Sequence, residues 1–246
     1  MRNRSLSAAA YVALALPLVS CDPKSPPDRY ITRSATVSLL PDQQKWFHFT
    51  EHLTTKAFYC QYGSSGLAPD PPSGEGRVSV GFEHSWDPGT MPAPCSELLN
   101  HMHRGAVLFD LGELQKWEGR VLVEKATLKF KKFPRTGRFG CDDRILNATA
   151  DWTARPEDGV LPPAEERYKM PVPALETEPC MGPDGKCAVD VKRIVNDWAV
   201  GSVPNFGFIL AGENENYGVR DDNSCRTDYG QFELDVAYRY DERVPG

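Results

Sequence analysis

The stretch Arg104–Phe133, RGAVLFDLGELQKWEGRVLVEKATLKFKKF, decides the fold class that the sequence predicts. Two apolar segments flank a turn-rich middle. In the second segment, side chains alternate: Ala126, Leu128 and Phe130 point one way, and Thr127, Lys129 and Lys131 point the other. This period of two is typical of a β-strand with one face on a core and the other on water. The stretch therefore predicts two β-strands joined by a turn-rich connection.

The rest of the chain repeats this pattern. Its 246 residues include 21 Pro and 20 Gly, which punctuate the sequence too often for a helical protein. Short alternating segments are separated by long loops, of which Thr153–Pro173 is one. We therefore predict an all-β fold over residues 35–246, a single jelly-roll-like β-sandwich with one short helix and long loops.

The one predicted helix covers Asp190–Gly201. Its apolar residues fall at i, i+3, i+4 and i+7, which gives a single buried stripe: Val191, Ile194, Val195 and Trp198. Asp190 is placed to cap the first turn and Gly201 to end the helix.

The N-terminus has the features of an export signal. Arg2 and Arg4 precede an apolar segment, Ala8–Ser20, that is too short to span a bilayer. It ends in Leu18-Val19-Ser20-Cys21, which resembles the bacterial lipobox. We predict a lipoprotein signal peptide over 1–20, lipidation of Cys21, a tether over 21–34, and a bacterial envelope location on the periplasmic face or the cell surface.

Six cysteines remain after Cys21: Cys60, Cys95, Cys141, Cys180, Cys187 and Cys225. An even number in an exported protein predicts three disulfides. Cys180 and Cys187 flank the turn sequence MGPDGK and are expected to bridge a hairpin. For the other four, Cys60–Cys95 and Cys141–Cys225 is one of the possible pairings. A zinc site is disfavoured because no CxxC spacing exists.

The charge balance argues against nucleic acid as a partner. Removal of residues 1–20 takes away Arg2 and Arg4, which leaves 26 of the 28 basic residues against 34 acidic residues, a net charge of −8. Phosphate binding needs clustered Lys and Arg, and an acidic domain supplies few.

The C-terminal part resembles a known family. A series of motifs recurs in order: Arg104, Phe109 and Asp110; Ala126 and Leu128; Trp152 and Pro156; Asp190, Val191, Val195, Trp198 and Gly201; then Asn205, Gly207 and Leu210. This pattern resembles the DNRLRE-type β-sandwich domains of exported bacterial proteins, which are related to alginate-binding carbohydrate-binding modules. The resemblance covers about residues 76–240. It implies a non-catalytic surface module with a possible glycan ligand.

The residues suggest two kinds of ligand contact. Lys129, Lys131 and Arg135 belong to a basic cluster that suits an acidic polysaccharide, and a solvated strand face is the alternative interpretation. The aromatic candidates for sugar stacking are Trp86, Trp117 and Tyr217, and packing under a loop is the alternative.

The sequence contains no convincing catalytic or metal motif. His101 and His103 are two residues apart without a motif that would make them ligands, and Asp221–Asn223 resembles a calcium loop in composition only, so a structural calcium is the one cofactor considered. We predict no enzyme activity and no metal ligands. The predicted function is binding of a glycan or matrix polymer at the envelope. The alternatives are a structural or protein-adhesive lipoprotein that contacts a surface protein, and, third, a secreted hydrolase or lyase.

Overall fold

A computed structural model describes residues 29–54, 76–87, 97–137, 143–173, 180, 184–212 and 225–244. The fold is all-β, as predicted, with two short helices instead of one. The elements are β1 (Arg29–Leu39), β2 (Gln43–Thr54), β3 (Arg77–Asp87), β4 (Glu97–Leu108), α1 (Gly112–Gln115), β5 (Val121–Gly137), β6 (Asp143–Ala148), β7 (Ala164–Pro171), β8 (Lys186–Asp190), α2 (Lys192–Ala199), β9 (Phe208–Gly212) and β10 (Cys225–Val244).

All ten strands belong to one antiparallel sheet, in the order β7-β6-β9-β4-β3-β10-β5-β8. The strand β1 pairs with β10, and β2 pairs with β4. The sheet has two wings joined by β3, which bonds to β10 through residues 77–82 and to β4 through residues 81–87. One wing holds β1, β10, β5 and β8; the other holds β2, β4, β9, β6 and β7.

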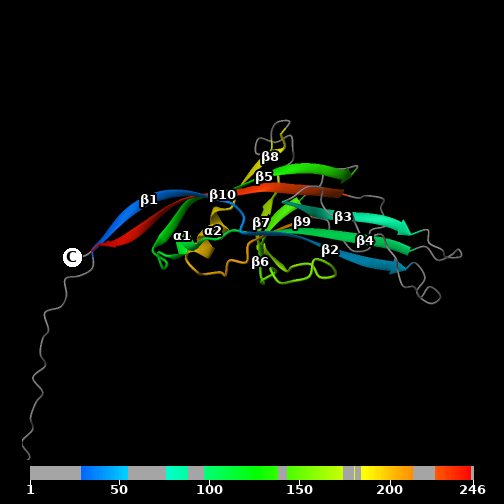
Figure 1. Cartoon of the computed structure of the whole chain (residues 1–246), viewed down its shortest axis with the longest axis horizontal. Helices are drawn as coiled ribbons and strands as arrows, with labels where there is room; N and C mark the ends of the chain where they lie inside the picture. Colours follow the sequence, from blue (N-terminus) through cyan, green and yellow to red (C-terminus); the bar gives the residue numbers. More distant parts are fainter. Residues whose placement is uncertain are drawn as a thin grey trace, which may run out of the picture.

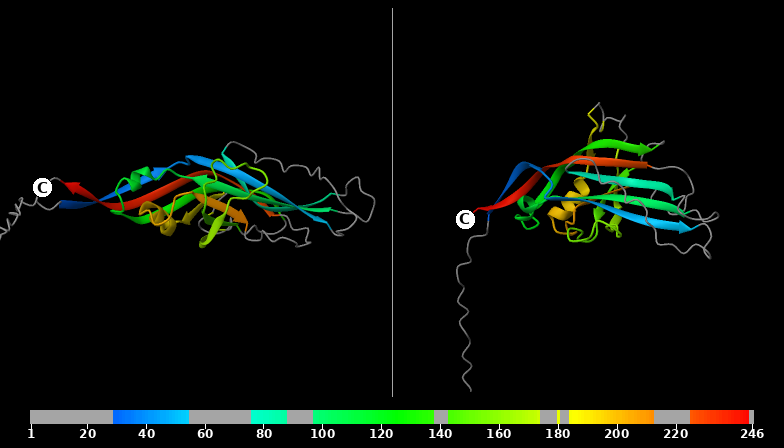
Figure 2. Two further views of the ribbon diagram at one scale, coloured as in Figure 1. Left: turned by 90° about the horizontal axis from the view of Figure 1, so that it is seen from below. Right: turned by 45° about the vertical axis from the view of Figure 1, so that its right-hand side comes forward.

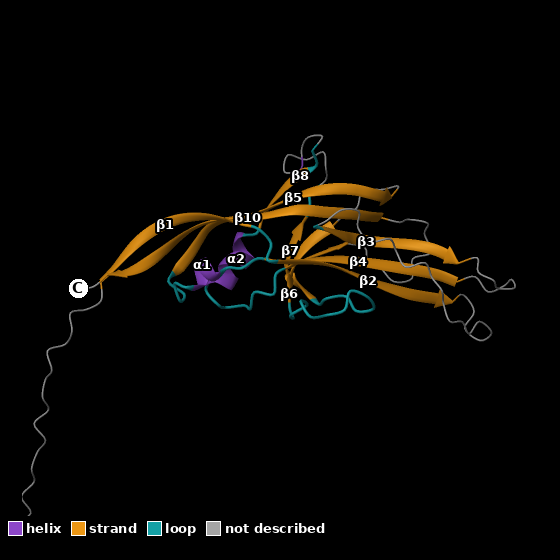
Figure 3. Ribbon diagram, in the orientation of Figure 1, coloured by secondary structure: helices purple, strands orange, loops and turns teal. Residues whose placement is uncertain are grey.

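The sheet is long and strongly curled. Figure 1 shows β1 and β10 forming an arm at the end where the C-terminus lies, while β2, β3 and β4 extend toward the opposite end. The views in Figure 2 show how the long strands twist along the molecule. In the view of Figure 3, both helices appear near the base of the arm.

The main core lies between the two wings. It takes side chains from β5 and β10 on one wing, such as Leu128 and Val236, and from β4 and β9 on the other, such as Val107 and Phe208. A smaller cluster lies on the opposite face of β2, β4 and β9, where Phe47 packs edge-on against Trp152. Both faces of the β4–β9 wing are therefore buried, which explains the continuously apolar sequence of β9.

The predicted helix is confirmed as α2. Its stripe is buried as expected, and Trp198 is only 1% exposed while its Nε1 donates to Asn147 Oδ1 at 3.2 Å. Asp190 Oδ1 accepts from the Lys192 backbone N–H at 2.8 Å, which supports the first turn. Gly201 has a φ of +73°, the left-handed conformation that ends a helix.

The residues that carry the family resemblance hold the fold together. Trp152, predicted as core, is 1% exposed, and its Nε1 donates to Phe206 O at 2.6 Å. Asn205 Nδ2 donates to Phe109 O at 2.9 Å. Gly207 follows with a φ of +83°, and a Cβ there would lie 2.4 Å from Val107 O. Packing, hydrogen bonds and backbone conformation therefore account for the residues found at these motif positions, without a role in ligand binding.

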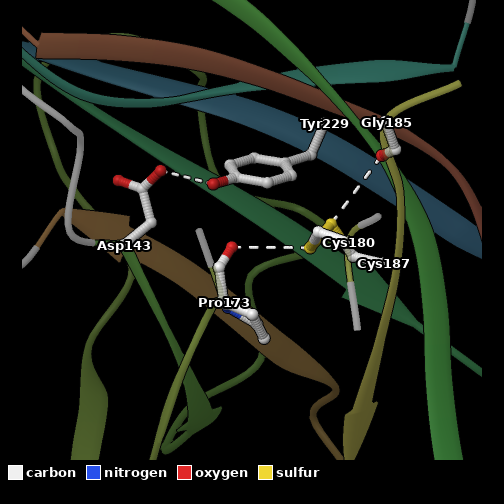
Figure 4. The surroundings of a disulfide bond; sticks show 6 residues. All are labelled: Asp143, Pro173, Cys180, Gly185, Cys187 and Tyr229. Atoms are coloured by element: carbon white, nitrogen blue, oxygen red, sulfur yellow. Dashed lines mark hydrogen bonds between the residues drawn. A yellow bond between two sulfur atoms is a disulfide. The ribbon is translucent and has the colours of Figure 1, made fainter. Parts of the chain in front are cut away.

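The disulfide Cys180–Cys187 is present, as predicted. Figure 4 shows its setting: Cys180 Sγ lies 3.4 Å from Pro173 O, and the buried Tyr229 hydroxyl nearby donates to Asp143. The bridge ties Cys180 to Cys187, which lies in β8 (Lys186–Asp190). Of the other cysteines, Cys225 begins β10, while Cys21, Cys60, Cys95 and Cys141 lie outside the described residues.

Two predicted boundaries were wrong. The strand β1 begins at Arg29, so residues 29–34 of the predicted tether are extended and pair with β10. The predicted loop Thr153–Pro173 contains β7, which pairs with β6. The polar composition and the prolines of this segment concealed a strand that is short and mostly exposed.

Candidate functional site

On the predicted basic face of β5, Lys129 is paired with carboxylates of β10. Lys129 Nζ lies 2.5 Å from Asp235 Oδ2 and 3.7 Å from Glu233 Oε1, because Glu233 is its register partner on β10. The hydrogen bond to Asp235 raises the pKa of Lys129, and the same bond, with one from Ser38, lowers the pKa of Asp235. Much of the charge of Lys129 is therefore already neutralised.

The other predicted contacts are dispersed. Trp117 is half-buried and stacks on Tyr240, with ring centroids 3.9 Å apart. Tyr240 is seven residues from Glu233 along β10, which places Trp117 about 20 Å from Lys129. Lys131 lies 5.0 Å from the centre of the Phe133 ring. The backbones of Trp86 and Arg135 belong to β3 and β5; their side chains, like all of Tyr217 and Asp221–Asn223, lie outside the described residues.

A concave site lies elsewhere, between the start of β5, the edge strand β7 and the helix α2. Its volume is about 480 Å³. Leu122, Val123, Met170 and Ile194 supply apolar lining, and four basic residues surround it: Arg167, Lys169, Lys192 and Arg193. We call this site the α2–β7 groove. It combines apolar surface with clustered positive charge, which is how binding sites for charged organic ligands are usually built.

Tyr168 joins the groove to the core. It is 5% exposed, and its hydroxyl donates to Asp197 Oδ2 on α2 at 2.6 Å. Burial first, and then this bond to a carboxylate, raise the pKa of Tyr168. The guanidinium groups of Arg167 and Arg193 lie 4.9 and 5.3 Å from the ring centre. The ring therefore fixes α2 against β7 and holds two cations at the rim.

The charges at the rim are not balanced locally. Arg167 pairs with Glu165 at 3.0 Å, and the two carboxylates of the groove are engaged, Asp190 with the first turn of α2 and Asp197 with Tyr168. Lys192 and Arg193 are exposed, and neither has a carboxylate partner among the described residues. These two side chains are therefore the cations most available to a ligand.

A second polar cluster lies buried where β10, β3, β4 and β2 adjoin. Arg226 Nε donates to Ser79 Oγ at 3.0 Å, and Ser79 donates in turn to Asp228. The Arg226 guanidinium lies 5.6 Å from the Trp46 ring, which stacks with His103. Arg226 and Asp228 are each 2% exposed, and Ser79 links them. We therefore interpret this cluster as a structural network, because its charged groups are buried and joined by hydrogen bonds.

The two histidines considered as ligands are also buried. His101 Nδ1 lies 3.0 Å from Thr50 Oγ1, and His103 is 0% exposed. Across the parts of the chain that the structure describes, no group of three or more His, Cys, Asp or Glu side chains could hold a metal ion. Arg104 and Asp110 have backbone partners: Arg104 donates to Pro162 O at 2.7 Å, and Asp110 accepts from Gly112 N at 2.8 Å.

Sequence reasoning missed the groove because it missed β7. The segment Arg167-Tyr168-Lys169-Met170 alternates basic and apolar residues, a short signal of period two inside the predicted loop. That signal could have placed Tyr168 inward and both cations outward. No pattern in the sequence indicates that β7 lies beside α2.

Comparisons with known proteins add no evidence about the function of the groove. The chain matches no family model, no curated protein and no solved structure. The DNRLRE resemblance therefore stays a prediction. Among the helices in the described residues, none has the length and apolar character needed to cross a membrane.

Proposed function

We propose that this protein is an exported, lipid-anchored, non-catalytic binding protein whose ligand is an acidic glycan or matrix polymer of the bacterial envelope. The observation that carries the proposal is the α2–β7 groove, where an apolar-lined cavity of about 480 Å³ is bordered by Lys192 and Arg193, two cations without a carboxylate partner in the described part of the chain. The anchor is Cys21, and the resemblance to alginate-binding modules favours a carboxylated sugar. We further propose that the two wings of the sheet correspond to the layers of a jelly-roll-like sandwich, linked here through β3.

The groove suits such a ligand for two physical reasons. Arginine and lysine form charge-assisted hydrogen bonds with carboxylates, and two cations on one turn of α2 match charges repeated along a polymer. Leu122, which is 48% exposed, offers an apolar surface on which the C–H face of a sugar ring can rest. The net negative charge of the chain disfavours contact of an acidic polymer with the surface as a whole, so binding favours a local basic site such as this one.

Lys129, Lys131 and Arg135 form an alternative contact surface. For Lys129, binding would first require release from Asp235 and Glu233. We therefore expect this face to contribute less than the groove.

A glycan array that includes uronate polymers tests the proposal. We expect binding that weakens about tenfold or more in the double variant Lys192→Ala/Arg193→Ala, because each exposed charge contributes up to about 1 kcal/mol. The matched control is Lys129→Ala/Lys131→Ala, which also removes two positive charges but leaves binding nearly unchanged. Absence of binding, or equal loss in both variants, would refute the groove as the site and would favour the structural or protein-adhesive alternative.

Fractionation of cells tests the anchor separately. The Cys21→Ala variant should leave the membrane fraction, because a protein held by acyl chains alone has no other attachment of comparable strength. Continued membrane association of this variant would contradict lipidation at Cys21.

A further inference from the structure

The arm formed by β1 and β10 ends in a two-stranded tip. Beyond Tyr240, which pairs with Val121 of β5, β10 has β1 as its one strand partner among the described residues. Residues 241–244 therefore pair with residues 29–32, and no third described strand joins them. Figure 1 shows this tip projecting from the rest of the sheet. A two-stranded ribbon by itself is marginally stable in water, so a projecting tip gains from contact with another surface.

The side chains of the tip have the composition of a membrane interface. Tyr30 and Ile31 are 50% and 45% exposed, and because they are neighbours on a strand they lie on opposite faces of the ribbon. Arg29 and Arg243 are exposed beside them, and the Arg120 guanidinium lies 5.3 Å from the Tyr30 ring. Tyrosine and arginine both favour the boundary between headgroups and acyl chains.

The tip is also more basic than the chain as a whole. The tip holds Arg29 and Arg243 against Asp241 and Glu242, and two further arginines, Arg33 and Arg120, lie directly behind it. Asp241 accepts a hydrogen bond from Thr32, and Glu242 accepts one from Arg33. The local excess of positive charge in an acidic protein is suited to anionic phospholipid headgroups, to which each basic residue near the surface adds about 1 kcal/mol.

The predicted lipid anchor at Cys21 indicates that the surface contacted by the tip is the membrane. Arg29 follows Cys21 by eight residues, a length of chain that reaches at most about 28 Å. If Cys21 is lipidated, the tip is the part of the described protein that starts within this distance of the bilayer. Tethering at such short range raises the effective concentration of the surface, so two apolar side chains and a small excess of charge are enough for lasting contact.

We propose that the β1–β10 tip rests on the bilayer surface, with Tyr30 and Ile31 at the headgroup level and the arginines on anionic phospholipid. This inference rests on the proposed lipid anchor. It also gives the groove a position: Val123 pairs with Tyr238, six residues from Val244, so the α2–β7 groove lies about 20 Å along the strands from the tip. The groove then meets polymer that lies immediately next to the membrane.

Hydrogen exchange on tethered protein tests the contact. The full mature chain carries an N-terminal histidine tag in place of the lipid and is bound to vesicles of phosphatidylglycerol and phosphatidylcholine that contain a chelating lipid. We expect the amides of residues 29–33 to exchange about threefold slower or more than in the free protein. Added salt should weaken the effect, as should vesicles without phosphatidylglycerol.

Variants decide which side chains are responsible. Tyr30→Ser/Ile31→Ser should abolish the slowing, whereas Leu40→Ser, which alters an apolar residue that is 76% exposed beyond the other end of β1, should leave it intact. Arg29→Gln/Arg243→Gln keeps the apolar residues and should reduce the slowing on anionic vesicles only. Equal exchange in free and tethered protein, or slowing that all variants retain, would overturn the proposal.

The design separates this inference from the proposed function. The tag replaces the lipid, so a failure of Cys21 lipidation appears in the fractionation experiment and leaves the vesicle result intact. Polymer binding is tested separately with the variant Lys192→Ala/Arg193→Ala, whose substituted residues lie outside the arm. A protein partner for the β1 edge, with no vesicle effect, would count against the membrane contact.

Discussion

The outward face of β5 and the α2–β7 groove both present basic side chains, but Lys129 on the first has carboxylate partners, whereas Lys192 and Arg193 in the second have none among the described residues. Lys129 lies opposite Glu233 and reaches Asp235 because β10 is the neighbouring strand on that face. Lys192 and Arg193 belong to a helix beside the edge strand β7, and within the residues that the structure describes neither has a carboxylate partner. A run of basic residues thus becomes a binding surface or a set of ion pairs according to what the next element places beside it.

The largest effect that distinguishes the two regions should come from Tyr168→Ala. The residue is buried between α2 and β7, so its loss should lower the free energy of unfolding by about 3 kcal/mol and remove polymer binding as the groove collapses. Urea denaturation gives the stability. Lys131→Ala on the β5 face is the control and should change stability by less than about 0.5 kcal/mol. Comparable destabilisation by both substitutions would mean that the groove is no better integrated with the core than the strand face.

The double substitution Cys180→Ala/Cys187→Ala should have the next largest effect. These residues bridge a sequence separation of seven, and closing so short a loop stabilises by about 2 to 3 kcal/mol. The strand β8 runs from Lys186, opposite Lys131, to Asp190 at the groove, so it borders both regions. Because α2 has its own buried stripe, we expect polymer affinity to persist in the variant, as measured on the folded protein at low temperature. Loss of affinity with the fold intact would show that the bridge positions the groove.

A smaller change should follow from Tyr168→Phe, which keeps the ring and removes the bond to Asp197. We expect a loss of about 1 kcal/mol at neutral pH. Because the folded-state pKa of Tyr168 is raised, its contribution is complete below the unfolded-state pKa near 10 and is lost as pH rises through the folded value. The alkaline decline in stability should therefore be shallower in the variant. If stability declined equally in both proteins at alkaline pH, the pKa of Tyr168 would not be raised in the folded state, which would contradict its burial and its bond to Asp197.

The sequence predicts what is local and periodic. The stripe from Val191 to Trp198, the alternation of β5 and the disulfide Cys180–Cys187 all depend on neighbours a few residues away, and the structure confirms them. The groove depends on β7 meeting α2, two segments separated along the chain. The continuity of the sheet depends on β3, which changes partners near Gly81. Such contacts leave no periodic signal, because either side alone is an ordinary strand or helix.

The same limit applies to charge. The alternation of β5 correctly places Lys129 outward, but its partner Asp235 is more than a hundred residues away in sequence. A count of basic residues on one strand therefore overstates the free charge of its face. The pairing becomes visible only when the register between β5 and β10 is known, and register is set by the buried residues of both strands.

The smallest effect, and the most direct test of the pairing, is the titration of Asp235. Its pKa is lowered by hydrogen bonds from Lys129 and Ser38, so the stabilisation is present above the unfolded-state pKa near 4 and is lost as pH falls through the folded value. In Lys129→Met the pKa should rise toward its ordinary value, although Ser38 Oγ, at 2.5 Å, retains part of the shift. NMR of the Asp235 carboxyl carbon measures this pKa in the unsubstituted protein and in Lys129→Met. A pKa that Lys129→Met leaves unchanged would mean that Lys129 is free in solution, and the β5 face would then equal the groove as a site for an acidic polymer.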